Sequence, residues 1–234
     1  MRDTGDLHRS MEAVTRDLGF RYFALIHHDD LSVPRVGRVD IKQYPPAIID
    51  ALYADGRFRR DPVFRASLRA GMAFLWSDLG SLIRLGRGDR AALSRGAREG
   101  LNEGITIPFV RLGDRLGSCT FAGMKRPEQA AVVLGAAQLI GVFAFQAALR
   151  VTGSTPVPAP PTRLHPRPRD CVVLAGQGQS NKQIARALAL TQRTVDGYLT
   201  EARRLFDAHD RASLVAGALL AGEVELHELR RQPE

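Results

Sequence analysis

The sequence predicts an α+β fold in two parts, an N-terminal α/β/α sandwich followed by a small all-α domain. Three observations lead to this prediction. Residues 1–152 mix helical and strand-like hydrophobic patterns, a proline-rich segment follows, and the remainder shows only helical spacing. A chain of 234 residues, 44% of them hydrophobic, is long enough to bury two cores of ordinary size.

The N-terminal part alternates amphipathic helices with short strands. We expect helices at Asp6–Leu18, Pro46–Tyr53, Arg90–Asn102 and after Pro127, and strands at Phe20–Ile26, Ile105–Val110 and Gly117–Ala122, with a turn around Gly113 and Asp114. Strands covered by helices on both sides form an α/β/α sandwich. Such a fold can hold a small apolar ligand between the sheet and its helices.

The most apolar segment, Ala130–Val151, is expected to be a core helix. Gln138, Gln146 and Arg150 interrupt it, and its uninterrupted apolar stretches are too short to span a bilayer. We expect this helix to be buried on most sides, between the sheet and a partner subunit.

Other features of the chain favour the reducing cytoplasm and no membrane partner. The charged start of the sequence lacks an apolar secretory run. Cys119 and Cys171 fall in different halves of the chain, which indicates neither a disulfide framework nor a metal site.

A proline-rich segment, Thr152–Thr162, separates the two parts. Its four prolines make it an extended, semi-rigid spacer. The predicted boundaries are 1–152 for the N-terminal domain, 153–163 for the linker and 164–234 for the C-terminal domain.

The segment Ser180–Phe206 has the spacing of two short helices joined by a tight turn at Ala189 and Leu190. Apolar residues repeat at helical intervals on one face of each helix: Ile184, Ala185 and Leu188, then Val195, Leu199 and Ala202. Ser180 and Thr191 are placed to cap the two helices, because their hydroxyls can accept backbone N–H groups that have no helical partner. This pattern predicts a helix-turn-helix.

The outer face of the second helix carries arginines at both ends. At 100° per residue, this face contains Arg193, Gly197, Thr200 and Arg204, with Asp196 and Arg203 beside it. Such a helix suits the major groove of DNA, and a formal net charge of +8 favours a polyanionic partner. The alternative is an ordinary helical hairpin with a solvated basic face.

The run from Leu164 to Ala216 resembles the DNA-binding domain of LuxR-type transcription regulators. The matching residues are Leu164, Pro166, Arg167, Gly178, Ser180, Asn181, Lys182, Ile184, Ala185, Leu188, Arg193, Thr194, Val195, Leu199 and Leu205. The resemblance implies a fourth helix, at about Arg211–Leu229, that supports dimerisation.

From this resemblance and the helix geometry, we expect a homodimer that binds double-stranded DNA at a dyad-symmetric site. The residues expected to contact phosphates are Ser180, Asn181, Lys182, Arg193, Arg203 and Arg204. Those expected to read bases are Gln192, Asp196 and Thr200, and Thr194 belongs to the same DNA-binding set.

Three residues depart from the family pattern in this domain. Pro168 replaces a glutamate that would complete a capping box, although the first turn of a helix tolerates proline. Ala189 replaces the usual glycine of the turn, which costs about 1 kcal/mol if the backbone there has positive φ. Asp196 stands where a basic residue is common; it either accepts from a cytosine amino group or pairs with Arg193 or Thr200, and we favour the intrahelical pairing.

Residues Leu7–Arg150 resemble, with sparse identity, the acyl-homoserine-lactone-binding domain of the same family. The matching residues are Gly19, Phe20, Tyr44, Pro45, Asp61, Pro62, Val63, Trp76, Ser77, Gly104 with the following Ile-Thr-Ile-Pro, and Thr120. The resemblance implies that Asp61 accepts the ligand amide N–H, that Trp76 donates to the lactone carbonyl, and that Thr120 and Tyr44 complete the polar set. Gly104 would leave room beside the ligand or in packing.

Each of these residues also has a structural interpretation. Asp61 could pair with Arg57, Arg60 or Arg65, and a lone tryptophan such as Trp76 is usually a core residue. Thr120 could be β-branched packing in a strand, and Tyr44 could only shape a loop.

The sharpest departure lies just before Asp61. The family has a tryptophan and a tyrosine where this chain has Ile48 and Leu52. Leu52 cannot donate a hydrogen bond, which costs about 1 kcal/mol at a buried carbonyl. We therefore expect a more apolar pocket that binds an acyl-homoserine lactone differently, or another small apolar signal, or no ligand.

The sequence contains only weak indications of a metal site or a catalytic site. The run from His27 to Asp30 has metal-ligating residue types, but we expect a solvated loop there because neighbours on a strand point opposite ways. No nucleophile–base arrangement is apparent, and we expect no enzyme activity and no cofactor besides the small-molecule signal.

Taken together, the sequence predicts a ligand-responsive, dimeric transcription regulator of the quorum-sensing type. It would have an N-terminal α/β/α sandwich ligand-binding domain followed by a small all-α helix-turn-helix domain. The alternative is a protein-interaction regulator that forms inactive mixed dimers with a related receptor.

Overall fold

The computed structural model of the chain describes residues 3–29, 37–53, 60–110, 115–154 and 163–230, without the side chains of residues 51–53. The chain divides into two compact units, Met1–Pro156 and Val157–Glu234. The predicted turn at Gly113 and Asp114 and most of the predicted linker lie outside the described residues.

The N-terminal unit is built on a five-stranded sheet in the order β2-β1-β5-β4-β3, in which all neighbours are antiparallel. Its strands are β1 (Tyr22–His27), β2 (Asp40–Gln43), β3 (Phe74–Leu75), β4 (Gly104–Phe109) and β5 (Gly117–Ala122). Three of them, β1, β4 and β5, lie within two residues of the predicted strands. The edge strands β2 and β3 were not predicted.

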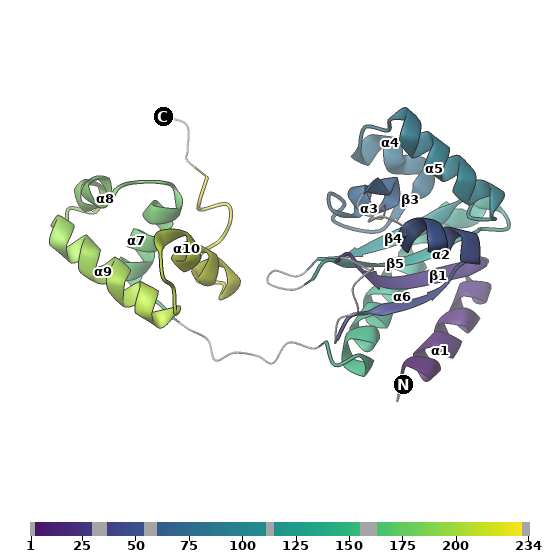
Figure 1. Cartoon of the computed structure of the whole chain (residues 1–234), viewed down its shortest axis with the longest axis horizontal. Helices are drawn as coiled ribbons and strands as arrows, with labels where there is room; N and C mark the ends of the chain where they lie inside the picture. Colours follow the sequence, from purple (N-terminus) through teal and green to yellow (C-terminus); the bar gives the residue numbers. More distant parts are fainter. Residues whose placement is uncertain (1–2, 30–36, 54–59, 111–114, 155–162, 231–234) are drawn as a thin grey trace. The chain divides into compact units, whose positions relative to one another are not determined.

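Helices cover both faces of this sheet, which confirms the α/β/α sandwich (Figure 1). One face is covered by α1 (Thr4–Asp17) and α6 (Ala130–Val151), and the other by α2 (Pro46–Tyr53), α3 (Pro62–Ser67), α4 (Leu79–Leu82) and α5 (Arg87–Arg98). Asp3 caps α1 by accepting the N–H of Asp6, and Asp61 caps α3. Both helices therefore begin at an aspartate whose side chain accepts backbone N–H groups of the first turn.

Strand β5 separates the two layers, and its side chains alternate between them. Cys119 and Phe121 belong to the core cluster that includes Phe145 of α6. Ser118 and Thr120 point to the opposite side, toward a cavity under α2 and α3. There is no room for a side chain at Gly117, because a Cβ there would lie 2.3 Å from the ring of Phe145.

Within the single chain, helix α6 is buried on the side that packs on the sheet; the expected burial of its other side by a partner subunit stays a prediction. Its inward side includes Gly141, against which Ile107 packs so closely that a Cβ would lie 3.0 Å away. Its outward side exposes Val132 (83%), Leu139 (64%) and Phe143 (70%). By length and composition the helix could cross a membrane, but its inner side packs on the sheet.

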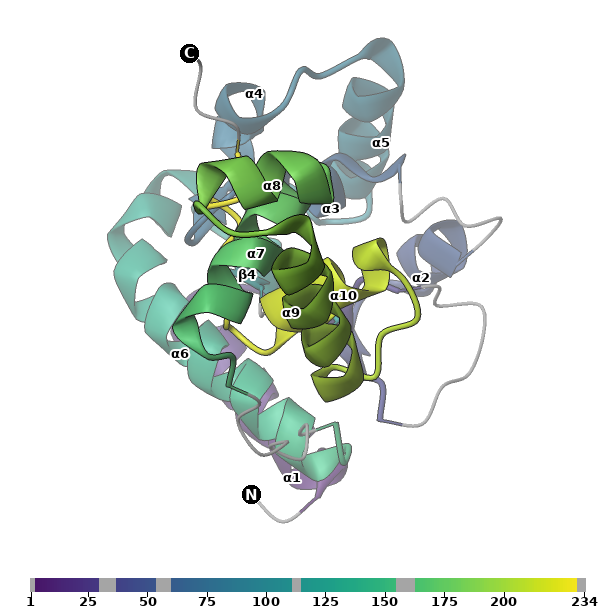
Figure 2. The same cartoon turned by 90° about the vertical axis from the view of Figure 1, so that its left-hand side faces the viewer.

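The C-terminal unit is all helical, as predicted, with α7 (Pro166–Gly176), α8 (Asn181–Ala187), α9 (Gln192–Leu205) and α10 (Arg211–Leu220) around one core (Figure 2). The predicted inward residues Ile184, Val195 and Leu199 are buried in it. The fourth helix was expected to reach Leu229, but it ends at Leu220. The reason is Gly222, whose φ of +73° ends a helix in the left-handed conformation.

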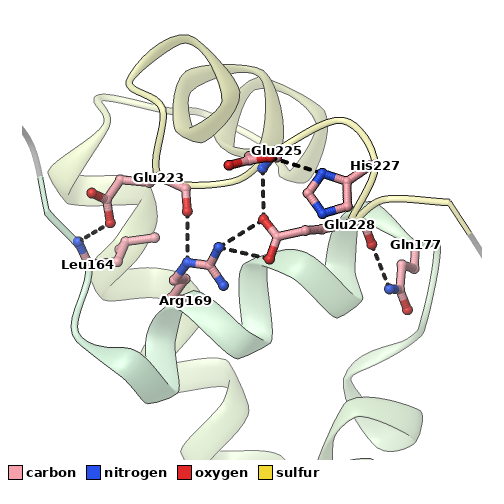
Figure 3. Close-up of polar contacts among 7 residues, drawn as sticks. All are labelled: Leu164, Arg169, Gln177, Glu223, Glu225, His227 and Glu228. Carbon is pink, nitrogen blue, oxygen red and sulfur yellow. Dashed lines mark hydrogen bonds and ion pairs between the residues drawn. The ribbon is translucent and has the colours of Figure 1, made fainter.

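Residues 221–230 are held against α7 by polar contacts centred on Arg169 (Figure 3). Its guanidinium donates to both carboxylate oxygens of Glu228 at 2.8 Å and, through Nε, to the carbonyl of Glu223 at 2.8 Å. The amide of Gln177 donates to the carbonyl of Glu228, and the backbone N–H of Leu164 donates to the carboxylate of Glu223. This segment thus closes the helical domain.

These contacts predict a pH effect on the C-terminal domain. The Arg169 guanidinium beside Glu228 holds the pKa of that carboxyl below its usual value of 4.5. A group with a lowered folded pKa contributes stability above its unfolded pKa and loses it as the pH falls through the folded pKa. We expect residues 221–230 to exchange amide hydrogens faster below about pH 4.5, and Glu228→Gln to exchange faster at neutral pH but without this added acid dependence.

The effect should be small, about 1 kcal/mol or less, because both partners are partly exposed. Hydrogen-exchange mass spectrometry of the full chain at several pH values measures it, with wild type and variant compared at each pH. Glu225→Gln is the control, since Glu225 forms an exposed pair with His227. Equal acid dependence in wild type and Glu228→Gln would contradict the assignment.

Candidate functional site: an internal cavity and an exposed helical face

A cavity of about 600 Å³ lies between the sheet and helices α2, α3 and α5 of the N-terminal unit. Its lining includes five of the seven predicted ligand residues: Tyr44, Ile48, Asp61, Trp76 and Thr120. Gly104 is not among the lining residues, and the side chain of Leu52 lies outside the described residues. The remaining lining has apolar residues, namely Ala24, Ile26, Val63, Phe64, Ala92, Leu93 and Leu101, and polar or charged ones, namely His27, His28, Arg60, Arg65, Asp89, Arg95 and Ser118.

Asp61 stands at the start of α3 and presents its carboxylate to the cavity. Its Oδ1 accepts the backbone N–H groups of Val63 at 2.9 Å and Phe64 at 3.1 Å. Burial raises the pKa of Asp61, while these N–H groups oppose that rise by stabilising the charged form. Among the described residues Oδ2 accepts no hydrogen bond, so it can accept one from a ligand.

The alternative in which Asp61 pairs with a neighbouring arginine is not what the structure shows for Arg65. Arg65 pairs with Asp89 of α5, with Nη1 2.8 Å from Oδ1. That ion pair joins α3 to α5 at the edge of the cavity, and α5 has no buried residue of its own. Of the other two partners considered, Arg57 lies outside the described residues, and Arg60 lines the cavity without forming an ion pair with Asp61.

The other polar groups of this wall form a chain of hydrogen bonds. The indole N–H of Trp76 donates to Thr106 at 3.0 Å, and the hydroxyls of Thr106 and Thr120 are 3.1 Å apart. Tyr44 and Thr120 both line the cavity, and burial raises the pKa of the Tyr44 phenol, so it stays protonated. The expected donation from Trp76 to a lactone carbonyl stays a prediction; within the chain its indole N–H donates to Thr106, a residue that sequence reasoning missed.

A buried carboxylate, also missed by sequence reasoning, fixes the position of Trp76. Glu103 is only 9% exposed, and its Oε1 accepts the backbone N–H groups of Trp76 (3.0 Å), Ser77 (3.3 Å) and Gly104 (2.8 Å). A Cβ on Gly104 would lie 2.7 Å from the indole of Trp76 and 2.9 Å from the carbonyl oxygen of Phe121. Of the two roles expected for Gly104, the structure thus shows the packing role.

His27 is buried in strand β1, which corrects the expectation of a solvated loop for that residue, while His28 follows the strand and is half-buried. His27 ends β1 with no exposed surface, and its Nδ1 accepts the backbone N–H of Val39. His28 lines the cavity, where its Nε2 is 2.8 Å from the hydroxyl of Ser118. Burial, with a contribution from His27, lowers the pKa of His28 to about 3, so its ring is neutral at physiological pH.

A serine hydroxyl at this distance from an imidazole is a nucleophile–base geometry that sequence analysis did not find. A ring with a pKa of about 3, however, is a poor proton acceptor at neutral pH. The described part of the chain places no carboxylate within hydrogen-bonding distance of His28. The pair is therefore better suited to binding than to catalysis.

The two helices of the helix-turn-helix begin at the predicted capping residues. Ser180 caps α8 in a reciprocal box with Gln183, and Thr191 caps α9 by accepting the N–H of Thr194 at 3.1 Å. Ala189 occupies the turn with a φ of +54°. An alanine therefore stands in a left-handed conformation that favours glycine, at a cost of about 1 kcal/mol.

The outer face of α9 is exposed, as the helical spacing predicts. The exposed residues of the predicted DNA-binding set are Ser180, Lys182, Gln192, Arg193, Asp196, Thr200 and Arg204, while Asn181, Thr194 and Arg203 are half-buried. This surface is available to a nucleic acid.

Asp196 has a partner other than those expected, and neighbouring polar side chains form further contacts. Asp196 was expected to pair with Arg193 or Thr200, but its carboxylate accepts the side-chain amide of Asn181 in α8. Arg211 of α10 donates in turn to Asn181 at 3.0 Å, and Arg203 donates to Thr200 at 3.0 Å. The first two contacts tie α8, α9 and α10 together, so Asp196 positions the exposed helix.

Comparisons with known proteins agree with both halves of this description. The autoinducer binding domain matches residues 3–148, and the luxR family of bacterial regulatory proteins matches residues 163–218. The quorum sensing-dependent transcriptional regulator RpaR of Rhodopseudomonas palustris is 34% identical over 176 residues, covering 75% of this chain and 71% of RpaR. The transcriptional activator AhyR of Aeromonas hydrophila is 25% identical over 214 residues, covering 89% of this chain and 82% of AhyR.

A crystal structure of SdiA from Escherichia coli has the same fold, with a TM-score of 0.55 and 18% identity over 95% of this chain and 92% of SdiA. SdiA in complex with octanoyl-rac-glycerol gives a TM-score of 0.56, also at 18% identity, over 94% of this chain and 89% of that one. The family matches together span nearly the whole chain. This protein belongs to the LuxR family of quorum-sensing transcription regulators that carry an autoinducer-binding domain.

Proposed function

We propose that this chain is a cytoplasmic, homodimeric regulator that binds an N-acyl-homoserine lactone, or a related small apolar signal, and thereby controls binding to a dyad-symmetric DNA site. The observation that carries the proposal is the cavity with Asp61, Tyr44 and Thr120 on one wall and apolar residues around them. A largely apolar cavity of about 600 Å³ with a few convergent polar groups has the size and character of a small-molecule site.

In this proposal the polar head of the signal lies against Asp61. Oδ2 accepts the amide N–H, and the hydroxyls of Tyr44 and Thr120 hold the acyl carbonyl. Ile48 lines the cavity and offers no hydrogen bond. Ile48 therefore contributes only apolar contact, which favours recognition of the signal through its amide.

The exposed side of α6 supports the dimer. Val132, Leu139 and Phe143 form an apolar stripe on the outer face of a helix that carries no charge before Arg150. Exposed apolar patches of this kind mark interaction surfaces, and a second copy of the same helix matches an uncharged stripe. A two-fold pair would place two α9 helices for successive half-sites of one operator.

The test combines ligand and DNA binding. With N-octanoyl-homoserine lactone at 100 times its Kd, the N-terminal domain should gain about 2.7 kcal/mol of stability, measured by thermal unfolding. Sedimentation should give a dimer, and gel shifts should report binding to a dyad DNA that changes with the lactone. A homodimer that binds lactone but never DNA would instead favour inactive mixed dimers with a related receptor.

Replacing Arg204 with alanine tests the DNA face directly. Arg204 is exposed near the end of α9, and we expect it to contact a phosphate. Its removal should lower the slope of log affinity against log salt by about one unit without changing site preference. Arg16→Ala, an exposed arginine of the other domain, is the control. Unchanged affinity and slope in Arg204→Ala would show that this end of α9 does not face DNA.

A further inference from the structure

The cavity has a second polar position, separate from the group around Asp61. Ser118 lies two residues before Thr120 on the same face of β5, about 7 Å along the strand, and is 8% exposed. Its hydroxyl contacts His28 Nε2 at 2.8 Å, and the other ring nitrogen of His28 is 3.4 Å from the hydroxyl of Ser67. Apolar residues, among them Ile26 and Phe64, line the same cavity.

The direction of each hydrogen bond in this group follows from one fixed donor. Ser67 donates its hydroxyl hydrogen to the carbonyl of Phe64 at 2.7 Å, so its oxygen can only accept from His28. The Nδ1 of His28 must then carry the ring hydrogen, and Nε2 of the neutral ring is an acceptor. Ser118 consequently donates its hydrogen to Nε2.

Because its hydrogen is used in this way, the Ser118 oxygen presents only lone pairs to the cavity. Within the described residues it accepts no hydrogen bond. We propose that Ser118 selects signals whose acyl chain carries a hydroxyl group at this second position. The proposal rests on the proposed function, since it concerns the chain of a signal whose head lies at Asp61.

The same geometry disfavours a ketone. A ligand hydroxyl can donate to the Ser118 oxygen, whereas a ketone oxygen would face lone pairs and would lose its hydrogen bonds to water without replacement. An unsubstituted methylene neither gains nor loses a hydrogen bond. The expected order of affinity is therefore hydroxyl first, methylene second and ketone last.

The experiment compares N-octanoyl-homoserine lactones that are unsubstituted, hydroxylated or oxidised to a ketone, with the substituent moved along the chain one carbon at a time. Affinity for the full-length protein is measured by calorimetry. At the best carbon the hydroxyl compound should bind about threefold to tenfold more tightly than the unsubstituted one, and the ketone several-fold more weakly.

Two variants test whether the preference for a hydroxyl group comes from Ser118 and from the direction of its hydrogen bond. Ser118→Ala should bring the ratio between the affinities of the hydroxylated and unsubstituted lactones to about one. Ser67→Ala removes the group that fixes the histidine tautomer, so Ser118 can turn and donate, and the preference for hydroxyl over ketone should shrink. The matched control is Ser81→Ala, whose exposed hydroxyl makes the same bond to the carbonyl three residues earlier.

The outcomes are distinguishable from failure of the proposed function. If no lactone binds, the proposed signal class is wrong and this inference falls with it. If the unsubstituted lactone binds but no hydroxyl position improves it, or if Ser118→Ala keeps the preference, only the inference is overturned. Hydrolysis of a lactone that depends on Ser118 would also overturn it, since the pair with His28 would then be catalytic.

Discussion

Replacing Asp61 with asparagine is expected to weaken the binding of an acyl-homoserine lactone by roughly 10-fold to 100-fold. A hydrogen bond to a charged group contributes about 1.5–3 kcal/mol, and asparagine replaces the carboxylate oxygen that faces the cavity with an N–H donor. That donor would face the N–H of the ligand. The oxygen that caps α3 remains, because asparagine caps a helix as well as aspartate does.

The asparagine variant therefore separates binding from folding. Without ligand, its melting temperature should match that of the wild type, and only the shift caused by the lactone should shrink. Asp3→Asn is the control, because Asp3 caps α1 of the same domain by the same kind of bond and does not line the cavity. A lactone-induced shift of full size in Asp61→Asn would show that this carboxylate does not hold the ligand.

A methyl group added at Gly104 is expected to destabilise the N-terminal domain by about 1–3 kcal/mol. The new Cβ would lie 2.7 Å from the Trp76 ring and 2.9 Å from the backbone oxygen of Phe121. The ring cannot move away easily, because Glu103 holds its backbone N–H and Thr106 accepts from its indole. For a domain of about 150 residues the melting temperature should fall by roughly 2–10 °C.

The single tryptophan of the chain makes this change visible. Gly104→Ala should alter the fluorescence of Trp76 as well as lower the unfolding midpoint, since the ring must shift to admit the methyl group. Gly80→Ala serves as the control, because a Cβ there meets nothing within 4 Å. A midpoint equal to that of the wild type would mean that the contact at Gly104 relaxes without cost.

Sequence reasoning succeeded where neighbours along the chain decide the structure. The caps at Ser180 and Thr191 and the buried face of α9 follow from helical spacing within a few residues. It also placed Asp61 and Thr120 on one site, but through a family resemblance. The roles of these residues toward a ligand and toward DNA stay predictions.

The failures involve contacts between distant parts of the chain. Asp196 bonds to Asn181, fifteen residues away in another helix, so counting along α9 could not find it. Thr106 meets Trp76 because β4 pairs with β3, the strand that directly precedes Trp76. His27 was assigned to a loop because β1 extends one residue further than its hydrophobic pattern.

The alternation along β5 has a consequence for communication within the domain. Ser118 and Thr120 contact whatever fills the cavity, while Cys119 and Phe121 support α6 from the other side of the same strand. A bound ligand and a second subunit packed on α6 would thus act on opposite faces of the same strand. Whichever binds first orders β5 and so lowers the entropic cost of binding the other. We therefore expect ligand binding and dimerisation to be positively cooperative.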